Sequence, residues 1–172
     1  MGHDVTICTL SGNKSAYPIS NRIKLVTLGI NRRRIFLSKL ISIFTLTTEI
    51  SKVIKIVSPD IVVNAQTEIV TWILPFIARS KSKIMEIHFS KDGMKHNVHN
   101  KSSFFKFIYW NSLKFFYSRY SRFVVLTPED KPQWNLNNCV VINNFTQIHI
   151  DKISDVDNTN IICVGRYSTQ KR

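Results

Sequence analysis

His88 is the residue of this sequence best placed for acid–base chemistry. It ends the apolar segment KIMEIH, which reads as a strand, and the polar loop FSKDG follows it. In open α/β sheets ligands bind beyond the carboxyl ends of the strands, so its imidazole is expected to face a ligand crevice. A purely structural histidine is the alternative. Glu86, in alternation with His88, is expected to point to the other face of the strand and is the weaker candidate.

The closing segment VGRYSTQKR combines a glycine turn with cations that suit a diphosphate. Gly165 lets the backbone pass close to a ligand. Arg166 could bind two phosphate oxygens at once through its guanidinium group, and Lys171 could attract the phosphate as a point charge. The spacing does not match a Walker A loop, and a solvated basic tail is the alternative.

A metal site is not predicted. Asp92, His96 and His99 follow His88, but they stand in a polar loop and their spacing fits no standard zinc pattern.

Cations outnumber acids along the whole chain. The 172 residues include 24 Lys and Arg against 11 Asp and Glu, a net charge of +13, which favours phosphates, nucleic acid or acidic lipid headgroups as partners. The segment from Phe104 to Arg122 interleaves aromatic residues with Lys106, Lys114 and Arg119. That pattern suits an anionic membrane surface or stacked bases, or an aromatic stripe that faces the core.

The elements that position these residues alternate between strands and helices. Several strands are continuously apolar, and 60–64 is expected to be buried on both faces. The pattern predicts an α/β fold with a Rossmann-like, doubly wound and mostly parallel sheet. Strands are expected at 4–10, 23–28, 60–64, 83–88, 122–127 and 139–143, and helices at 34–57, 67–80, 102–120 and 128–134.

The polar segment 143–159 divides the chain. It follows a domain at 1–142 and precedes 160–172, which reads as the first strand and phosphate turn of a second domain. No uncharged apolar run reaches the length of about 18 residues that a membrane span needs.

Six segments in order resemble the N-terminal, acceptor-side half of the GT-B-fold glycosyltransferases of family 4. The resemblance covers nearly the whole chain and is strongest at LTPEDK and GRYSTQK. The segments are GHDVTICTL, SPDIVVN, EIHFS, RFVVLTPEDK, CVVINN and VGRYSTQKR.

The resemblance implies an enzyme of hexosyltransferase type. Such enzymes transfer a sugar from a nucleotide donor, commonly a UDP-sugar, with retention of configuration and without a cofactor or bound metal. His88 matches the histidine that faces the donor sugar, and Arg166 and Lys171 match the cations that hold the donor diphosphate. The implied acceptor is a bacterial-type cell-surface polysaccharide or a lipid-linked glycan. Cys8, Cys139 and Cys163 stand in separate apolar runs and suit a reducing cytoplasm, and the basic aromatic segment 104–122 motivates peripheral contact at the inner face of the cell membrane. Nucleic acid is not an expected partner.

The chain also departs from the family pattern. Family members usually carry a strand, a glycine-rich loop and a helix before the GHDV segment, and a nucleotide-binding domain after the position of Arg172. We therefore expect a chain trimmed at both ends, with a central strand lacking and unpaired sheet edges exposed. The alternative hypothesis is a non-catalytic basic α/β module that binds anionic membrane or nucleic acid.

Overall fold

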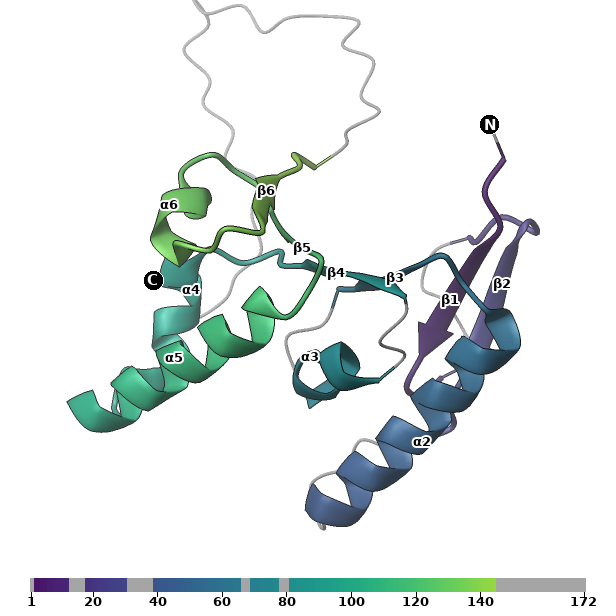
Figure 1. Ribbon diagram of the computed structural model, residues 1–172, viewed down its shortest axis with the longest axis horizontal. Helices are drawn as coiled ribbons and strands as arrows, with labels where there is room; N and C mark the ends of the chain where they lie inside the picture. Colours follow the sequence, from purple (N-terminus) through teal and green to yellow (C-terminus); the bar gives the residue numbers. More distant parts are fainter. Residues whose placement is uncertain (1, 13–17, 31–38, 66–68, 78–80, 145–172) are drawn as a thin grey trace, which may run out of the picture.

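The computed structural model of the protein describes residues 2–12, 18–30, 39–65, 69–77 and 81–144, with the side chains of 39–42, 96 and 97 left out (Figure 1).

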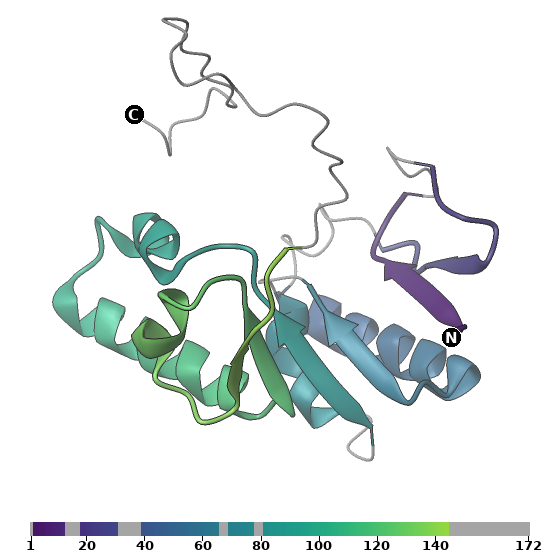
Figure 2. The same ribbon diagram turned by 90° about the horizontal axis from the view of Figure 1, so that it is seen from above.

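Parallel strands form two sheets in the described part of the chain. The first sheet has two strands, and the second has four strands in chain order, all of them parallel (Figure 2). The structure thus confirms the predicted α/β fold with parallel strands, consistent with a Rossmann-like doubly wound type. The strands are β1 (Val5–Thr9) and β2 (Ile23–Thr27) in the first sheet, and β3 (Ile61–Asn64), β4 (Ser82–Glu86), β5 (Arg122–Val125) and β6 (Cys139–Val141) in the second.

The larger helices lie on one face of the four-stranded sheet (Figure 1). Because successive strands add in one direction, crossovers of the same right-handed sense place their helices on the same side. The helical elements are α2 (Lys39–Val57), α3 (Ile69–Ile73), the 3₁₀ turn η1 (Leu74–Phe76), α4 (Lys91–Met94), the 3₁₀ turn η2 (Lys95–Val98), α5 (Ser103–Ser118) and α6 (Asp130–Trp134).

The opposite face of β3 is open. Ile61 and Val63 are 55% and 56% exposed, while Asn64 on the helical side is buried. The expectation that this strand is buried on both faces is therefore wrong. Its apolar run reflects parallel pairing with β4 rather than cover on two sides.

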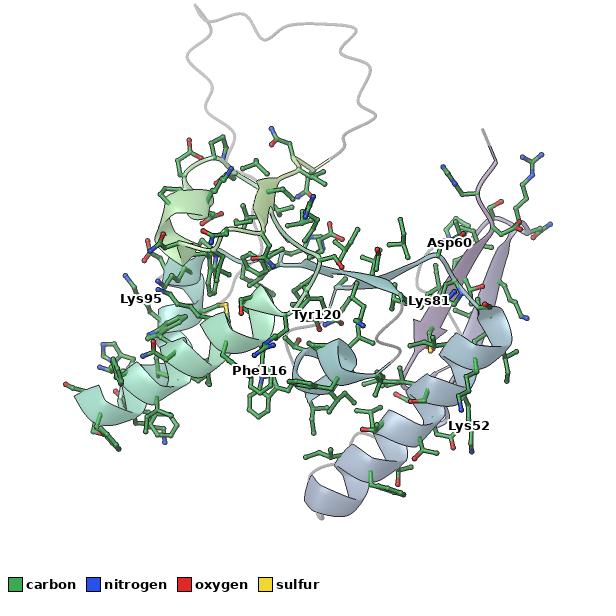
Figure 3. The ribbon with its side chains drawn as sticks, viewed as in Figure 1. Lys52, Asp60, Lys81, Lys95, Phe116 and Tyr120 are labelled. Carbon is green, nitrogen blue, oxygen red and sulfur yellow. The ribbon has the colours of Figure 1, made fainter. Side chains whose placement is uncertain are left out.

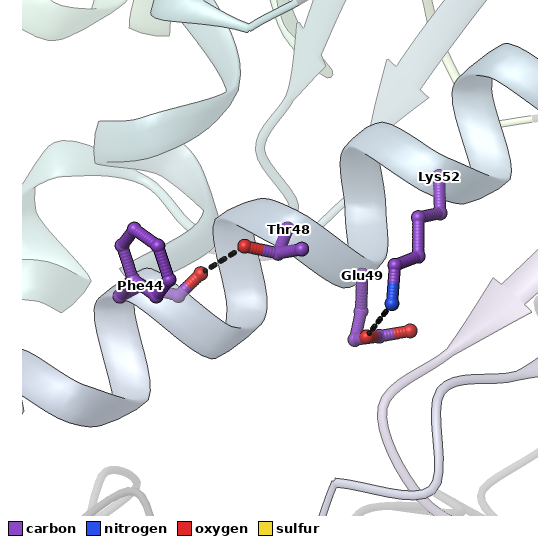
Figure 4. Close-up of polar contacts among 4 residues, drawn as sticks. All are labelled: Phe44, Thr48, Glu49 and Lys52. Atoms are coloured by element: carbon purple, nitrogen blue, oxygen red, sulfur yellow. Dashed lines mark hydrogen bonds and ion pairs between the residues drawn. The ribbon is translucent and has the colours of Figure 1, made fainter.

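Helix α2 is amphipathic, although Phe44, one of the apolar residues whose helical spacing predicts the helix, is 75% exposed. Leu46, Ile50 and Ile54 are buried in the core. The outer side carries polar contacts beside the exposed Phe44 and Ile56 side chains. The Thr48 hydroxyl donates to the Phe44 carbonyl at 2.9 Å, and Lys52 Nζ lies 2.7 Å from Glu49 Oε1 (Figure 4). The helix ends at Val57, where Ser58 has a φ of 47° and precedes Pro59. Proline disfavours helical backbone in the residue before it, which explains the end of the helix.

Three aromatic rings fill the core between α5, β5 and α6. The ring of Trp134 is fully buried and lies 5.3 Å from that of Tyr117 and 5.2 Å from that of Phe123, both edge to face. Tyr117 and Phe123 stack on each other at 4.7 Å. Such ring pairs add stabilisation beyond the apolar area that they bury.

A buried polar network ties the end of β3 to α3 and to the turn after α5. The Asn64 Nδ2 group lies 3.2 Å from each of three acceptors that share its two hydrogens: Thr71 Oγ1, the Tyr120 hydroxyl and Met85 Sδ. The Tyr120 hydroxyl in turn donates to the Thr71 carbonyl at 3.0 Å. These bonds satisfy polar groups that would be costly to bury alone.

Trp134→Ala is expected to lower the free energy of unfolding by about 3–5 kcal/mol, because it leaves a large cavity in the core. Urea denaturation followed by circular dichroism measures the change. The matched control is Trp72→Ala, since Trp72 is 45% exposed, and a smaller loss of about 1–2 kcal/mol is expected there. Equal losses for the two variants would contradict this account of the core.

Tyr120→Phe is expected to reduce the decrease in the free energy of unfolding that the wild type shows as the pH rises above about 10. Burial raises the pKa of Tyr120 above its ordinary value of 10.0, although the hydrogen bond from Asn64 opposes this, and burial likewise raises the pKa of Tyr117. The folded state therefore keeps these protons to higher pH than the unfolded state. The resulting stability is complete below pH about 10 and is lost as the pH rises further. Urea midpoints across that range give the slope, and identical slopes for wild type, Tyr120→Phe and Tyr117→Phe would refute the assignment.

Candidate functional site

The candidate site lies at the carboxyl edge of the four-stranded sheet. Parallel pairing brings the carboxyl ends of β3, β4, β5 and β6 to this edge. β4 ends at Glu86, and the backbone amide of Ile87 still donates to the Val124 carbonyl of β5 at 3.1 Å. Because the Ile87 side chain is buried, it anchors the chain one residue before His88. His88 thus stands just beyond a fixed strand end, as predicted, with its side chain 45% exposed.

Glu86 and His88 lie on the same side of the sheet. His88 Nε2 is 3.5 Å from Glu86 Oε1, and the glutamate side chain is 32% exposed. The expectation that Glu86 points to the other face is wrong, because residues two apart along an extended chain share a face. The two side chains together form a carboxylate–imidazole pair at the ligand edge. The two-residue spacing was the signal that could have predicted this pairing.

The loop after His88 is closed by a helix cap. Ser90 is the N-cap of α4, and its Oγ accepts a hydrogen bond from the Gly93 amide at 3.1 Å. The Met94 amide donates to the Ser90 carbonyl at 3.2 Å, and the Met94 side chain is buried. This short helix therefore turns the chain back onto the core directly after the candidate histidine.

Lys91 fastens the same loop to α6. Its ammonium donates to the Gln133 carbonyl at 2.7 Å and lies 5.4 Å and 5.6 Å from the ring centroids of Trp110 and Trp134. Burial lowers the pKa of Lys91, and the nearby charge of Lys114 lowers it further. The hydrogen bond and the two aromatic faces compensate part of the lost hydration of this cation.

The arrangement suits proton transfer or hydrogen bonding to polar groups of a ligand. A half-exposed imidazole can donate or accept a hydrogen bond, and the adjacent carboxylate can hold one of its N–H groups in place. Among the described residues no group of three or more His, Cys, Asp and Glu side chains is placed to hold a metal ion. His99, from the same part of the sequence, lies 3.0 Å from Asn100 through its Nδ1.

The predicted donor-site residues cannot be placed relative to His88. Gly165, Arg166 and Lys171 lie in 145–172, outside the described residues, as do most of the predicted linker and the final strand. The side chain of His96 also lies outside them. The diphosphate site remains a prediction.

Comparison with known proteins assigns no family. No family model matches the chain, and no curated protein matches it significantly. Within the described ranges, none of the helices combines the length and the apolar composition that crossing a bilayer requires.

Lys91→Met is expected to loosen the His88 loop. Loss of one charge-assisted hydrogen bond, of about 1.5 kcal/mol, should speed amide exchange at Gly93 and Met94 about tenfold. Lys95→Met is the control, since Lys95 makes only an exposed ion pair with Asp92 at 2.6 Å in the described structure, and such pairs contribute little. Hydrogen exchange followed by NMR measures both variants, and equal acceleration in the two would show that Lys91 does not hold the loop.

Proposed function

We propose that this chain is the acceptor-side part of a retaining glycosyltransferase. It would take a sugar from a nucleotide donor, a UDP-sugar in this proposal, and pass it to a cell-surface polysaccharide or a lipid-linked glycan. The observation that carries the proposal is the pair of His88 and Glu86, 3.5 Å apart, at the carboxyl edge of a parallel α/β sheet. Ligands of such sheets bind at that edge.

Each residue has a stated role in the proposal. His88 faces the donor sugar and hydrogen-bonds its hydroxyls, and Glu86 orients the imidazole. When the glycosidic bond to the nucleotide breaks, negative charge grows on the departing diphosphate. Arg166 and Lys171 stabilise that charge, which is why the proposal needs no bound metal. Gly165 gives the phosphates room to approach the backbone.

Peripheral contact with an anionic membrane at the cytosolic face belongs to the same proposal. Helix α5 exposes large aromatic side chains: Phe104 and Phe107 are 73% and 67% exposed. Lys101 lies 5.7 Å from the ring centroid of Phe105 at the start of this helix. Exposed aromatic rings beside cations suit the headgroup region of a bilayer, where a lipid-linked acceptor would also be found.

A non-catalytic basic module is the second candidate, and the same exposed aromatic rings on α5 favour it. Such a module would hold anionic lipid or single-stranded nucleic acid, whose bases stack on aromatic side chains. An RNA titration at several salt concentrations separates these cases. Binding through phosphates would weaken steeply with salt, whereas the transferase proposal expects no specific RNA binding.

His88→Ala is expected to lower sugar transfer by about a hundredfold, in the range lost with a group that moves a proton or fixes the substrate. The assay measures release of UDP from UDP-sugars by the purified protein with membrane extract as the acceptor. His99→Ala is the matched control, since this exposed histidine bonds to Asn100 rather than to Glu86, and it should keep wild-type turnover.

Two results would count against the assignment. Equal turnover of the two histidine variants would remove His88 from the mechanism. Absence of UDP release from every donor and acceptor tested, also after the nucleotide-binding part that the proposal requires has been joined to this chain, would contradict the transferase proposal itself.

A further inference from the structure

A pocket lies at the amino edge of the four-stranded sheet, opposite the edge that carries His88. Its volume is about 440 Å³, and it opens where β4 and β5 begin and where η1 and α5 end. None of the described residues that line it is acidic. The lining residues are Pro75, Phe76, Lys81, Lys83, Arg119 and Ser121.

Three cations meet here through strand pairing. Lys83 is only 4% exposed, and its ammonium donates to the Ile77 carbonyl at 3.2 Å. Lys81 precedes β4, and its Nζ lies 3.5 Å from Ser58 Oγ. Arg119 is the C-cap of α5 and also lines the pocket. The Ser121 hydroxyl accepts from the Lys83 amide at 3.2 Å, so its own hydrogen is available to a ligand in the pocket.

The charge balance of the pocket stays positive. The cations face the carboxyl ends of two helical elements, and each such end carries at most about half a negative charge. Lys81 and Arg119 alone, with Lys83 left out of the count, exceed this by about one unit. Asp60, which lies at the same edge before β3 (Figure 3), is exposed and does not line the pocket. The single negative charge of a lipid phosphodiester complements this surplus.

An aromatic platform adjoins the cations. The Phe116 ring (Figure 3) stacks on Trp72 at 5.8 Å and meets the rings of Phe76 and Phe115 edge to face at 6.1 and 5.4 Å. Arg119 lies with its Cζ 4.8 Å from the centroid of the Phe115 ring. Trp72, Phe76 and Phe115 are each nearly half exposed. Free inorganic phosphate has no apolar surface that could pack on such rings, whereas aromatic rings can lie among the headgroups of a lipid bilayer.

We propose that this pocket binds the headgroup phosphate of an anionic membrane lipid, with Trp72, Phe76 and Phe115 resting among the neighbouring headgroups. The inference rests on the peripheral membrane contact in the proposed function and adds a second contact, at the end of α5 opposite the one that carries Phe104 and Phe107. It places this lipid site at the amino edge of the sheet, opposite the edge that carries His88. Acid–base chemistry and lipid contact would then use different ends of the same strands.

The test is sedimentation with vesicles of phosphatidylglycerol and phosphatidylcholine. The double variant Lys81→Gln/Arg119→Gln removes two pocket cations and spares the buried Lys83. The matched control, Arg22→Gln/Lys24→Gln, removes one arginine and one lysine from exposed positions at β2. Diffuse attraction would cost about fivefold in affinity per cation in both proteins. The proposal expects the pocket variant to lose at least about tenfold more than this control.

Two further experiments, a displacement assay and a fluorescence measurement, identify the ligand. A short-chain, soluble phosphatidylglycerol should displace the protein from vesicles, and inorganic phosphate at the same ionic strength should not. The fluorescence of wild type should shift to the blue on vesicle binding, and Trp72→Phe should lose most of the shift. Phe44→Ala, which removes an exposed ring from α2, should leave the affinity for vesicles unchanged.

The opposite results overturn the proposal. Equal vesicle binding by the two double variants would mean that the protein is attracted to the membrane by diffuse charge alone and not by the pocket. Displacement by inorganic phosphate, with no preference for phosphatidylglycerol, would assign the pocket to free phosphate. Circular dichroism confirms that each variant is folded. Vesicle binding requires no turnover, so failure here would leave the transferase proposal untouched, and a failed transfer assay would leave this result standing.

Discussion

The packing of Trp134 is the interaction on which the rest of the structure depends most. This ring is fully buried between Tyr117 of α5 and Phe123 of β5, and the ammonium of Lys91 lies over its face. It therefore joins a helix, a strand and the loop after His88 in one contact. Because the ring comes from α6, it also fixes the crossover that leads to β6. Aromatic packing of this kind holds the candidate histidine in place without any direct contact to it.

Parallel pairing then separates the chemistry of the two edges of the sheet. Every strand from β3 to β6 runs the same way, so all of their carboxyl ends meet at one edge and all of their amino ends at the other. The carboxyl edge carries a carboxylate and an imidazole, whereas the amino edge gathers lysines and an arginine around a pocket. A nucleotide sugar and a membrane lipid are both anionic, and in the two proposals made above they would bind at different edges of the same sheet.

The sequence patterns predicted the strands and helices well, because period-two and helical spacing reflect local geometry. The placement of His88 at the carboxyl end of a strand followed from the same signal. The side of Glu86 was wrongly predicted although the two-residue spacing contained the answer. The amino-edge pocket could not be predicted, because Lys83 and Ser121 are 38 residues apart and meet only through β4–β5 pairing. Exposure of Ile61 and Val63 likewise depended on which face the helices cover, which no local pattern encodes.

The central claim is that the carboxyl edge of the sheet receives the sugar nucleotide. Titration of isotope-labelled protein with a UDP-sugar, followed by NMR, tests this claim most directly, because it reports which residues sense the ligand. The account predicts saturable shifts at Glu86, His88 and the loop through Met94, with Lys81 and Arg119 unchanged. Shifts confined to the amino edge, or no saturable shift at His88, would contradict it.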